Sequence, residues 1–232
     1  LVRLDDDALT DGNPGGRGDN PDSQNTVGTL AHSYGADGEG STLLLATGAP
    51  SGFDYNLNGD GTILTISQNG TDVIRVSLTD TTSGDYTVEQ LAPVDHRAGG
   101  RENNQAFNIN YQTTDNDGDA ANGRMQINVD DDSPIAVIDT NIVTEGASVA
   151  GNVFDNDAIG ADNTNATAAV IGIATGSSTN AVLGNLTTPL IGTFGELTLR
   201  SNGSYTYNAT ADNITADAQD IFTYTIEDND GD

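Results

Sequence analysis

Aspartate provides most of the side chains in this chain that could do chemistry, and it recurs in two short patterns. The pentapeptide Asp-Asn-Asp-Gly-Asp occurs at residues 115–119 and again at 228–232. Three consecutive aspartates follow an apolar residue at 4–7 and again at 129–132. Ca²⁺ takes about six to eight oxygen ligands, which such clusters can supply. We therefore predict a calcium cofactor, held by Asp5, Asp6, Asp7, Asp115, Asp117, Asp119, Asp130, Asp131, Asp132, Asp228, Asp230 and Asp232.

Each pentapeptide has the composition of a tight turn, in which Gly118 and Gly231 allow the backbone to bend so that the flanking carboxylates converge. An EF-hand needs a bidentate acid at the twelfth loop position, but counting from Asp115 this position holds Gln126. Further ligands must therefore come from elsewhere, and the triple-aspartate segments are the natural source. One possibility is a junction at which the turn acids of one module meet the edge acids of its neighbour.

The charge balance favours bound cations. The chain has 35 acidic residues against seven basic ones, a formal net charge of −28, and 29 of the acids are Asp. Two carboxylates ~6 Å apart repel by roughly 0.7 kcal/mol in water and by about 3 kcal/mol at an effective dielectric of 20. The alternative is that the turns are solvated and the acids only keep the protein soluble. Either way, the charge argues against nucleic acid and anionic lipid as partners.

Apolar residues alternate with polar ones around the first pentapeptide, a pattern typical of strands with one buried face. Phe107, Ile109 and Tyr111 precede the turn, and Met125 and Ile127 follow it, which predicts a hairpin. A similar run at 222–226 precedes the second pentapeptide. Further strands are predicted at 41–45, 63–67, 73–78, 86–88, 169–173, 196–199 and 204–207. No segment keeps a helical period over three turns, so the fold class is all-β.

The repeats also mark modules. The Ser133-Pro134 pair breaks the strand that ends in the second triple aspartate. We therefore place one β-sandwich at residues 1–133 and a second, in tandem, at 134–232. By analogy with the first module, the second lacks its last strand, the one that would follow the turn; the sequence leaves open whether a domain is inserted there.

Residues 1–133 contain the stretches Tyr34-Gly35-Ala36-Asp37-Gly38, Ser51-Gly52-Phe53, the run at 61–66, Ala92-Pro93-Val94-Asp95-His96 and the terminal triple aspartate. With these stretches they resemble the extender repeats of a known family, the RTX adhesins exported by type I secretion. Residues 134–232 resemble their cadherin-like (VCBS-type) Ig-like modules, through the stretches at 151–157, 195–199, 202–207 and 222–226. The family's nonapeptide calcium repeats are absent.

The resemblance implies a calcium-stabilised structural extender of a large bacterial cell-surface adhesin, which projects ligand-binding domains for cell adhesion and biofilm formation. It also implies Ig-like sandwiches and an extracellular location, with any export signal outside residues 1–232. The expected partners are neighbouring modules of the same adhesin and, through adjacent domains, host or biofilm glycans. We expect a monomer without membrane insertion. The alternative is a module that itself binds carbohydrate or peptide; the lack of Trp favours the extender.

The remaining signals do not indicate an enzyme. His32 and His96 are the only histidines and there is no Cys, which argues against zinc. The chain contains no nucleophile elbow, zinc-protease motif or phosphate-binding loop, and no pair of carboxylates stands out for glycoside hydrolysis. We interpret Asp155 and Asp157 as ordinary turn residues.

Overall fold

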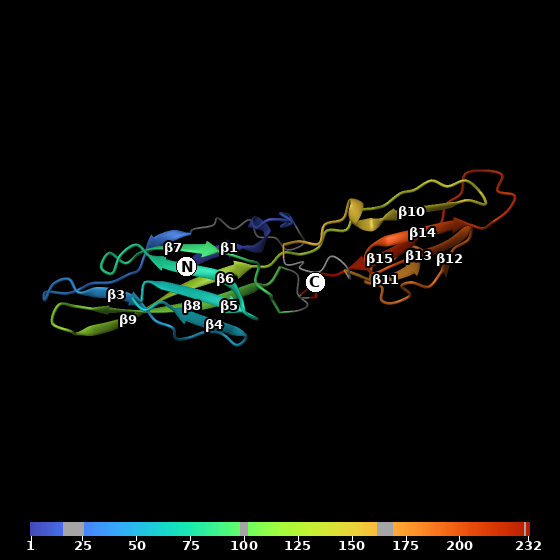
Figure 1. Ribbon diagram of the computed structural model, residues 1–232. Coiled ribbons are helices and arrows are strands. Elements are labelled where there is room, and N and C mark those ends of the chain that lie inside the picture. The colour runs from blue at the N-terminus through green and yellow to red at the C-terminus, as the bar shows by residue number, and fades with distance from the viewer. Residues whose placement is uncertain (16–25, 98–101, 162–168, 230) are drawn as a thin grey trace. The chain divides into compact units, whose positions relative to one another are not determined.

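The computed structural model describes residues 1–15, 26–97, 102–161, 169–229 and 231–232. The chain divides into two compact units, unit 1 (Leu1–Asp132) and unit 2 (Ser133–Asp232). Strands dominate both units (Figure 1), and the helical segments of the described residues are two single 3-10 turns, η1 (Asp6–Ala8) and η2 (Val153–Asp155). The all-β prediction is confirmed. None of the helical segments in the described ranges is long and apolar enough to span a bilayer.

Unit 1 is a sandwich of two sheets. The four-stranded sheet has the order β1-β9-β8-β3, and the five-stranded sheet has the order β2-β7-β6-β5-β4. The only parallel pair described in unit 1 joins β1 to β9; all its other strand pairs are antiparallel. The strands are β1 (Val2–Asp5), β2 (Val27–Thr29), β3 (Ser41–Leu44), β4 (Phe53–Leu57), β5 (Ile63–Gln68), β6 (Thr71–Leu78), β7 (Asp85–Gln90), β8 (Asn104–Thr114) and β9 (Ala120–Asp130).

The core of unit 1 lies between these sheets. The predicted alternation on β8 is confirmed, since Phe107, Ile109 and Tyr111 are all buried. Phe107 meets Phe53 of the opposite sheet edge to face, with 4.8 Å between ring centroids. Such a contact adds about 0.5–1.5 kcal/mol to the free energy of burial and fixes how the two sheets face each other. The predicted hairpin of β8 and β9 is also present, with Ile109 opposite Met125.

Unit 2 is a smaller sandwich in which one sheet has only two strands. Its larger sheet has the order β10-β14-β13-β12, and its smaller sheet pairs β11 with β15. The predicted strands of this unit are all found. The strands are β10 (Ser148–Asn152), β11 (Val170–Thr175), β12 (Leu190–Ile191), β13 (Gly195–Leu199), β14 (Ser204–Ala209) and β15 (Phe222–Ile226).

The core of unit 2 is only partly covered. Ile173, Leu199 and Val153 are buried, but Phe222 and Tyr224 of β15 are only partly buried although they pack against this core. All six residues of β14 are likewise only partly buried. The alternation at 222–226 therefore predicted the strand correctly, but not how much of its apolar surface is covered.

Candidate metal centres

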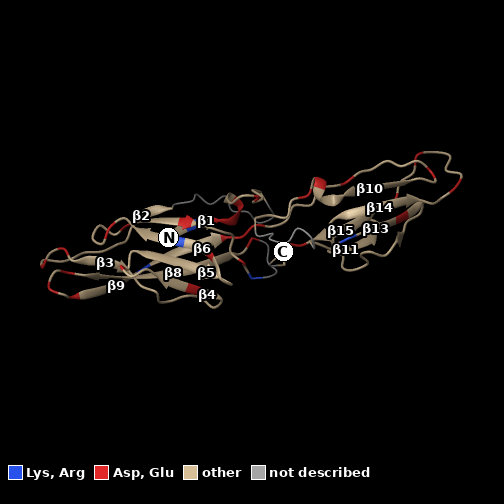
Figure 2. Ribbon diagram, viewed as in Figure 1, with Lys and Arg blue, Asp and Glu red and all other residues tan. Residues whose placement is uncertain are grey.

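The two triple-aspartate runs lie side by side at one end of unit 1. In the parallel pair, Leu4 stands opposite Val129 and Asp5 opposite Asp130, so the two similar sequences run in the same direction and in register. Asp5 then caps η1, because its Oδ1 accepts a hydrogen bond from the backbone N of Asp7 at 3.0 Å. Five of the six aspartates are buried, and Asp7 is half-buried. Most acidic residues elsewhere lie in loops and at strand ends (Figure 2).

An inner group of this cluster contains a histidine. The Nε2 atom of His96 lies 3.4 Å from Asp6 Oδ2 and 4.0 Å from Asp131 Oδ1, and all three side chains are buried. Asp6 also accepts hydrogen bonds from the side chain of Gln90 and, at 3.0 Å, from the backbone N of Val94. Burial raises the pKa of Asp6, although His96 and these hydrogen bonds act in the opposite direction. Asp6 is therefore held in place by several donors.

An outer group consists of carboxylates. Burial, an interaction with Asp132 and the charges of Asp132, Asp5 and Glu102 together raise the pKa of Asp7 to about 8. The Oδ1 atom of Asp7 is buried and has no hydrogen-bond partner among the described residues. The carboxylate of Asp132 is oriented by the backbone N of Asn13, at 3.1 Å and 3.3 Å from its two oxygens. A cation here would relieve the repulsion that shifts the pKa of Asp7.

The first Asp-Asn-Asp-Gly-Asp turn forms a separate, exposed group. Oδ1 of Asp115 accepts hydrogen bonds from the backbone N of Gly118 at 3.0 Å and of Asp119 at 2.8 Å. Although desolvation raises its pKa, Asp117 and these amides hold the pKa of Asp115 below its usual value. One carboxylate oxygen each from Asp37, Asp115 and Asp117 lies within 4.8 Å of the others, and Asp119 is not part of this group.

The turn group and the triple-aspartate cluster lie at opposite ends of the β8–β9 hairpin. Thr114 pairs with Ala120 beside the turn, whereas Asn104 pairs with Asp130 at the far end. With a rise of about 3.4 Å per residue, ten steps of β9 separate the two ends by roughly 34 Å. Within unit 1, the two aspartate patterns therefore cannot share one ion.

The second turn repeats the backbone geometry of the first. Oδ1 of Asp228 accepts hydrogen bonds from the backbone N of Gly231 at 3.0 Å and of Asp232 at 2.9 Å. Gly231 has φ 102° and Gly118 has φ 103°, the left-handed conformation that favours glycine. The predicted ligand Asp230 lies outside the described residues.

A further acidic group in unit 2 was not predicted. Oδ2 of Asp139 and Oδ2 of Asp157 each lie 2.8 Å from the hydroxyl oxygen of Tyr224. Burial raises the pKa of Asp139, as do the charges of Asp157 and Asp155, whereas Tyr224 lowers it. Asp157 also accepts a hydrogen bond from the backbone N of Val137 at 2.6 Å. Asp157 thus joins the segment before β10 to β15, which is more than the turn role we expected of it.

Several residues of the unit 1 groups could not be found from aspartate patterns. Glu102 and His96 come from the segment between β7 and β8, and Asp37 comes from the loop between β2 and β3. The sequence signal for His96 was its place in the stretch 92–96, which carried the family resemblance but no ligand pattern. Asp37 likewise stood in a stretch that carried the resemblance, 34–38, without a ligand pattern, and Glu102 gave no local signal; only the tertiary fold brings the two acids to the clusters.

The protein is an all-β protein made of two Ig-like β-sandwich units, which carry acidic groups at the ends of their strands. Residues 1–128 match the family described as Domain of unknown function (DUF5801), and the chain belongs to this family. Residues 131–232 match the bacterial Ig domain. No curated protein matches the chain. Neither match is to an enzyme family, and bacterial Ig domains are typically extracellular or surface-exposed, so the matches indicate a surface or structural protein.

Proposed function

We propose that this protein is a calcium-stabilised structural extender of a large bacterial adhesin, which carries ligand-binding domains away from the cell surface for adhesion and biofilm formation. The observation that carries the proposal is the in-register parallel pairing of β1 and β9. It brings two triple-aspartate runs together in a buried cluster. The family matches support a surface role, and the resemblance to RTX adhesins supplies the biological setting.

The donor atoms suit calcium in two of the groups. Asp132, Asp5 and Glu102 are close enough to Asp7 for their charges to raise its pKa, and the buried Oδ1 of Asp7 has no hydrogen-bond partner among the described residues. At the first turn, Asp37, Asp115 and Asp117 each place one carboxylate oxygen within 4.8 Å of the others. Ca²⁺ is a hard cation that prefers such oxygen ligands.

The inner group suits calcium less well, because His96 would offer a nitrogen. In our proposal, the imidazole instead lies between Asp6 and Asp131 and keeps both carboxylates oriented. Asp6 and Asp131 would then not bind the ion themselves, and the ligands would be the aspartates next to them in sequence, Asp7 and Asp132. The role proposed for His96 is positioning, and zinc is not required for it.

The first test is calcium removal from the full chain. We expect chelator-treated protein to melt roughly 10 °C or more below the calcium-loaded form, because an ion at about 100 times its dissociation constant adds about 2.7 kcal/mol. The small-angle scattering profile should also change on chelation. The proposal fails if melting temperature and scattering profile are the same with and without calcium.

Matched variants locate the ions. Asp7→Asn should weaken calorimetric calcium binding about tenfold or more at the strong site, because it removes one charged ligand. Asp115→Asn should weaken a different binding step. Asp54→Asn, on an exposed position of β4, removes the same charge away from both groups and should leave both steps unchanged. Equal effects of all three substitutions would mean that only net charge matters.

A further inference from the structure

The turn between β5 and β6 in unit 1 consists of an exposed Asn-Gly pair. Asn69 and Gly70 join the two strands, and Gln68 stands opposite Thr71. Both turn residues have positive φ, 50° and 84°, as the mirror-image turns of tight hairpins require. Both are exposed, and a Cβ added at Gly70 would meet no atom within 4 Å. The pair is therefore open to water at the tip of a hairpin.

An asparagine that precedes a glycine can react with its own backbone. The backbone N of the glycine attacks Cγ of the asparagine side chain, and the approach is least hindered when the second residue has no Cβ. The two atoms must come within about 3–3.5 Å of each other in the correct orientation. Hydrogen bonds that hold the side-chain amide or the next backbone N in another position therefore oppose the reaction.

Two further Asn-Gly pairs of unit 1 are held in this way. They are the pairs at 58–59 and 122–123. Oδ1 of Asn58 accepts hydrogen bonds from the backbone N of Thr62 at 2.9 Å and of Ile63 at 3.0 Å. Asn122 lies within β9, where its Oδ1 accepts a hydrogen bond from Nε2 of Gln112 at 3.0 Å. Both side-chain amides are fixed by these contacts.

The fourth Asn-Gly pair, Asn202 with Gly203, lies in unit 2 and is held at both reacting groups. Oδ1 of Asn202 accepts a hydrogen bond from the hydroxyl of Ser204 at 2.7 Å. The backbone N of Gly203 donates to the carbonyl of Arg200 at 3.0 Å. Neither group can turn towards the other without losing a hydrogen bond.

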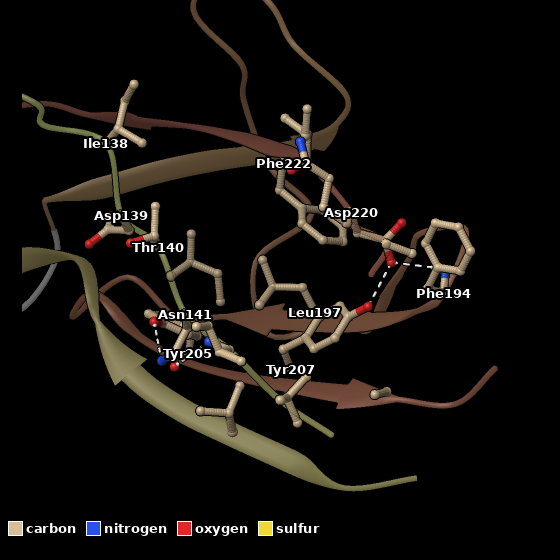
Figure 3. Close-up of a pocket in the computed structure, with 18 of the residues that line it drawn as sticks. Ile138, Asp139, Thr140, Asn141, Phe194, Leu197, Tyr205, Tyr207, Asp220 and Phe222 are labelled. Atoms are coloured by element: carbon tan, nitrogen blue, oxygen red, sulfur yellow. Dashed lines mark hydrogen bonds between the residues drawn. The ribbon is translucent and has the colours of Figure 1, made fainter. Parts of the chain in front are cut away.

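Asn141 of unit 2 shows the same restraint outside an Asn-Gly pair. Its Nδ2 donates to the hydroxyl oxygen of Tyr205 at 3.1 Å, a contact drawn in Figure 3. Its Oδ1 accepts a hydrogen bond from the backbone N of Ile142 at 2.9 Å. The side-chain amide and the next backbone N are therefore both engaged.

Asn69 lacks both kinds of restraint. Its Oδ1 and the backbone N of Gly70 have no hydrogen-bond partner among the described residues. The one described hydrogen bond of the side chain runs from Nδ2 to Oδ2 of Asp95, at 3.1 Å, and it is exposed. Of the four Asn-Gly pairs, this one is therefore the least hindered.

We propose that Asn69 is a site of spontaneous modification, at which the side-chain amide becomes a carboxylate. A bond forms between the backbone N of Gly70 and Cγ of Asn69, and the bond from Cγ to Nδ2 breaks. The amide proton of Gly70 leaves with the released NH₂ group as ammonia, and a five-membered imide remains in the chain. Water then opens the imide at either carbonyl and gives aspartate or its β-linked isomer at position 69.

The modification changes an attractive contact into a repulsive one. Nδ2 of Asn69 donates to the Asp95 carboxylate before the reaction, whereas two carboxylates face each other afterwards. Gln68 still holds Asp95, because its side chain donates to the Asp95 carbonyl at 2.6 Å and accepts from the Asp95 backbone N at 2.7 Å. Asp95 precedes His96 of the inner group, so the reaction loosens the segment that provides this histidine.

The first test compares the four Asn-Gly pairs within one molecule. The full chain is incubated in mildly alkaline buffer and digested, and mass spectrometry of the peptides measures the conversion of amide to acid at each pair. In the folded protein, Asn69 should react about tenfold or more faster than the asparagines at 58, 122 and 202. In protein unfolded by urea, the four rates should lie close together, because every pair then has only its glycine in common.

The proposal is overturned if Asn69 is not the fastest of the four in the folded protein, or if the folded and unfolded proteins show the same order of rates. None of the four asparagines is a predicted calcium ligand. A failure of this test would therefore leave the proposed calcium sites unaffected, and a failure to bind calcium would not change the expected order of rates.

A substitution tests the structural consequence. Asn69→Asp introduces the product directly and should speed amide hydrogen exchange at Asp95 by about threefold or more. Asn122→Asp, at an exposed position of β9, adds the same charge elsewhere and should leave the Asp95 amide unchanged. Unchanged exchange at Asp95 in both variants would overturn the loosening of this segment.

Discussion

The two units share a turn and a strand pattern, but they differ in how completely their cores are closed. Tyr111 and Tyr224 hold equivalent positions before the two turns. Tyr111 is 5% exposed, lies above Gly123 of β9 and donates a hydrogen bond to the carbonyl of Ala31 at 2.6 Å. Tyr224 is only partly buried, and its hydroxyl instead lies 2.8 Å from each of two carboxylates. The same local sequence therefore gives different burial, because β8 has a strand on each side whereas β15 pairs only with β11 among the described residues.

The sequence of a strand and its neighbouring strands therefore determine different properties of the core. The alternation of residues fixes which side chains of β8 and β15 face inward. The hydrophobic free energy depends on the area that the other strands cover, about 25 cal/mol per Å². Unit 1 obtains this covering from β9, and unit 2 leaves part of the same face open.

The largest expected difference between the units concerns their aromatic core residues. Phe107→Ala should destabilise unit 1 by about 3–5 kcal/mol, because it leaves a cavity in a closed core. Phe222→Ala should destabilise unit 2 by about 1–2 kcal/mol, because the side chain is already partly exposed. Chemical denaturation followed by residue-resolved hydrogen exchange reports each unit separately. Equal losses would contradict the view that the core of unit 2 is open.

For the equivalent tyrosines we expect the opposite order of stability losses, with the larger loss in unit 2. Tyr111→Phe removes one hydrogen bond to a carbonyl and should cost about 1 kcal/mol. Tyr224→Phe should cost about 1–3 kcal/mol, because it leaves Asp139 and Asp157 facing each other without the donor. Tyr205→Phe, which loses only a contact of 3.1 Å with Asn141, is the control and should change the stability least. Thermal melts of the three variants in one buffer give the comparison.

The smallest expected effect is the dependence of folding stability on pH, which should be steeper in unit 1 than in unit 2. In metal-free protein, folded Asp7 has its pKa raised to about 8 from the usual 3.8, so between these values the folded form holds a proton that the unfolded form has released. Stability is therefore greatest at acidic pH and falls as the pH rises towards 8. Asp6 acts in the same direction.

We expect the melting temperature of metal-free unit 1 to fall by roughly 4 °C between pH 5 and pH 8, and Asp7→Asn to reduce this slope. Asp54→Asn, at the exposed strand position already used as a charge control, should leave it unchanged. A melting temperature that rises over this range in the absence of metal would show that the Asp7 carboxyl is not protonated in the folded protein.

Much of the fold follows from local pattern. The alternation at Phe107, Ile109 and Tyr111 was enough to find β8, and Gly/Asn/Asp punctuation located the turns. The strand β4 was not predicted, because Phe53, Tyr55 and Leu57 alternate with Asp and Asn residues that are otherwise typical of turns. Residue propensity alone could not distinguish a strand from a turn at this position, and it is the pairing with β5 that makes the segment a strand.

The candidate metal sites were harder to predict from the sequence than the strands were. The similarity of residues 4–7 to 129–132 was visible, but it indicated module edges. The parallel pairing that brings Asp5 beside Asp130 within one unit depends on strands 125 residues apart, and no local signal encodes it. For the same reason, Glu102 and Asp37 join the clusters through tertiary structure alone.

The parallel pair of β1 and β9 also determines how unit 1 would respond to tension along the chain. The polypeptide enters along β1 and leaves along β9 in the same direction, with Val2 opposite Ile127 and Asp5 opposite Asp130. A pull on the two ends therefore acts along the strands and loads their hydrogen bonds together in shear, whereas an antiparallel hairpin pulled from its open end would unzip one bond at a time. Unit 1 thus resists stretching through the same ladder that aligns its two aspartate runs.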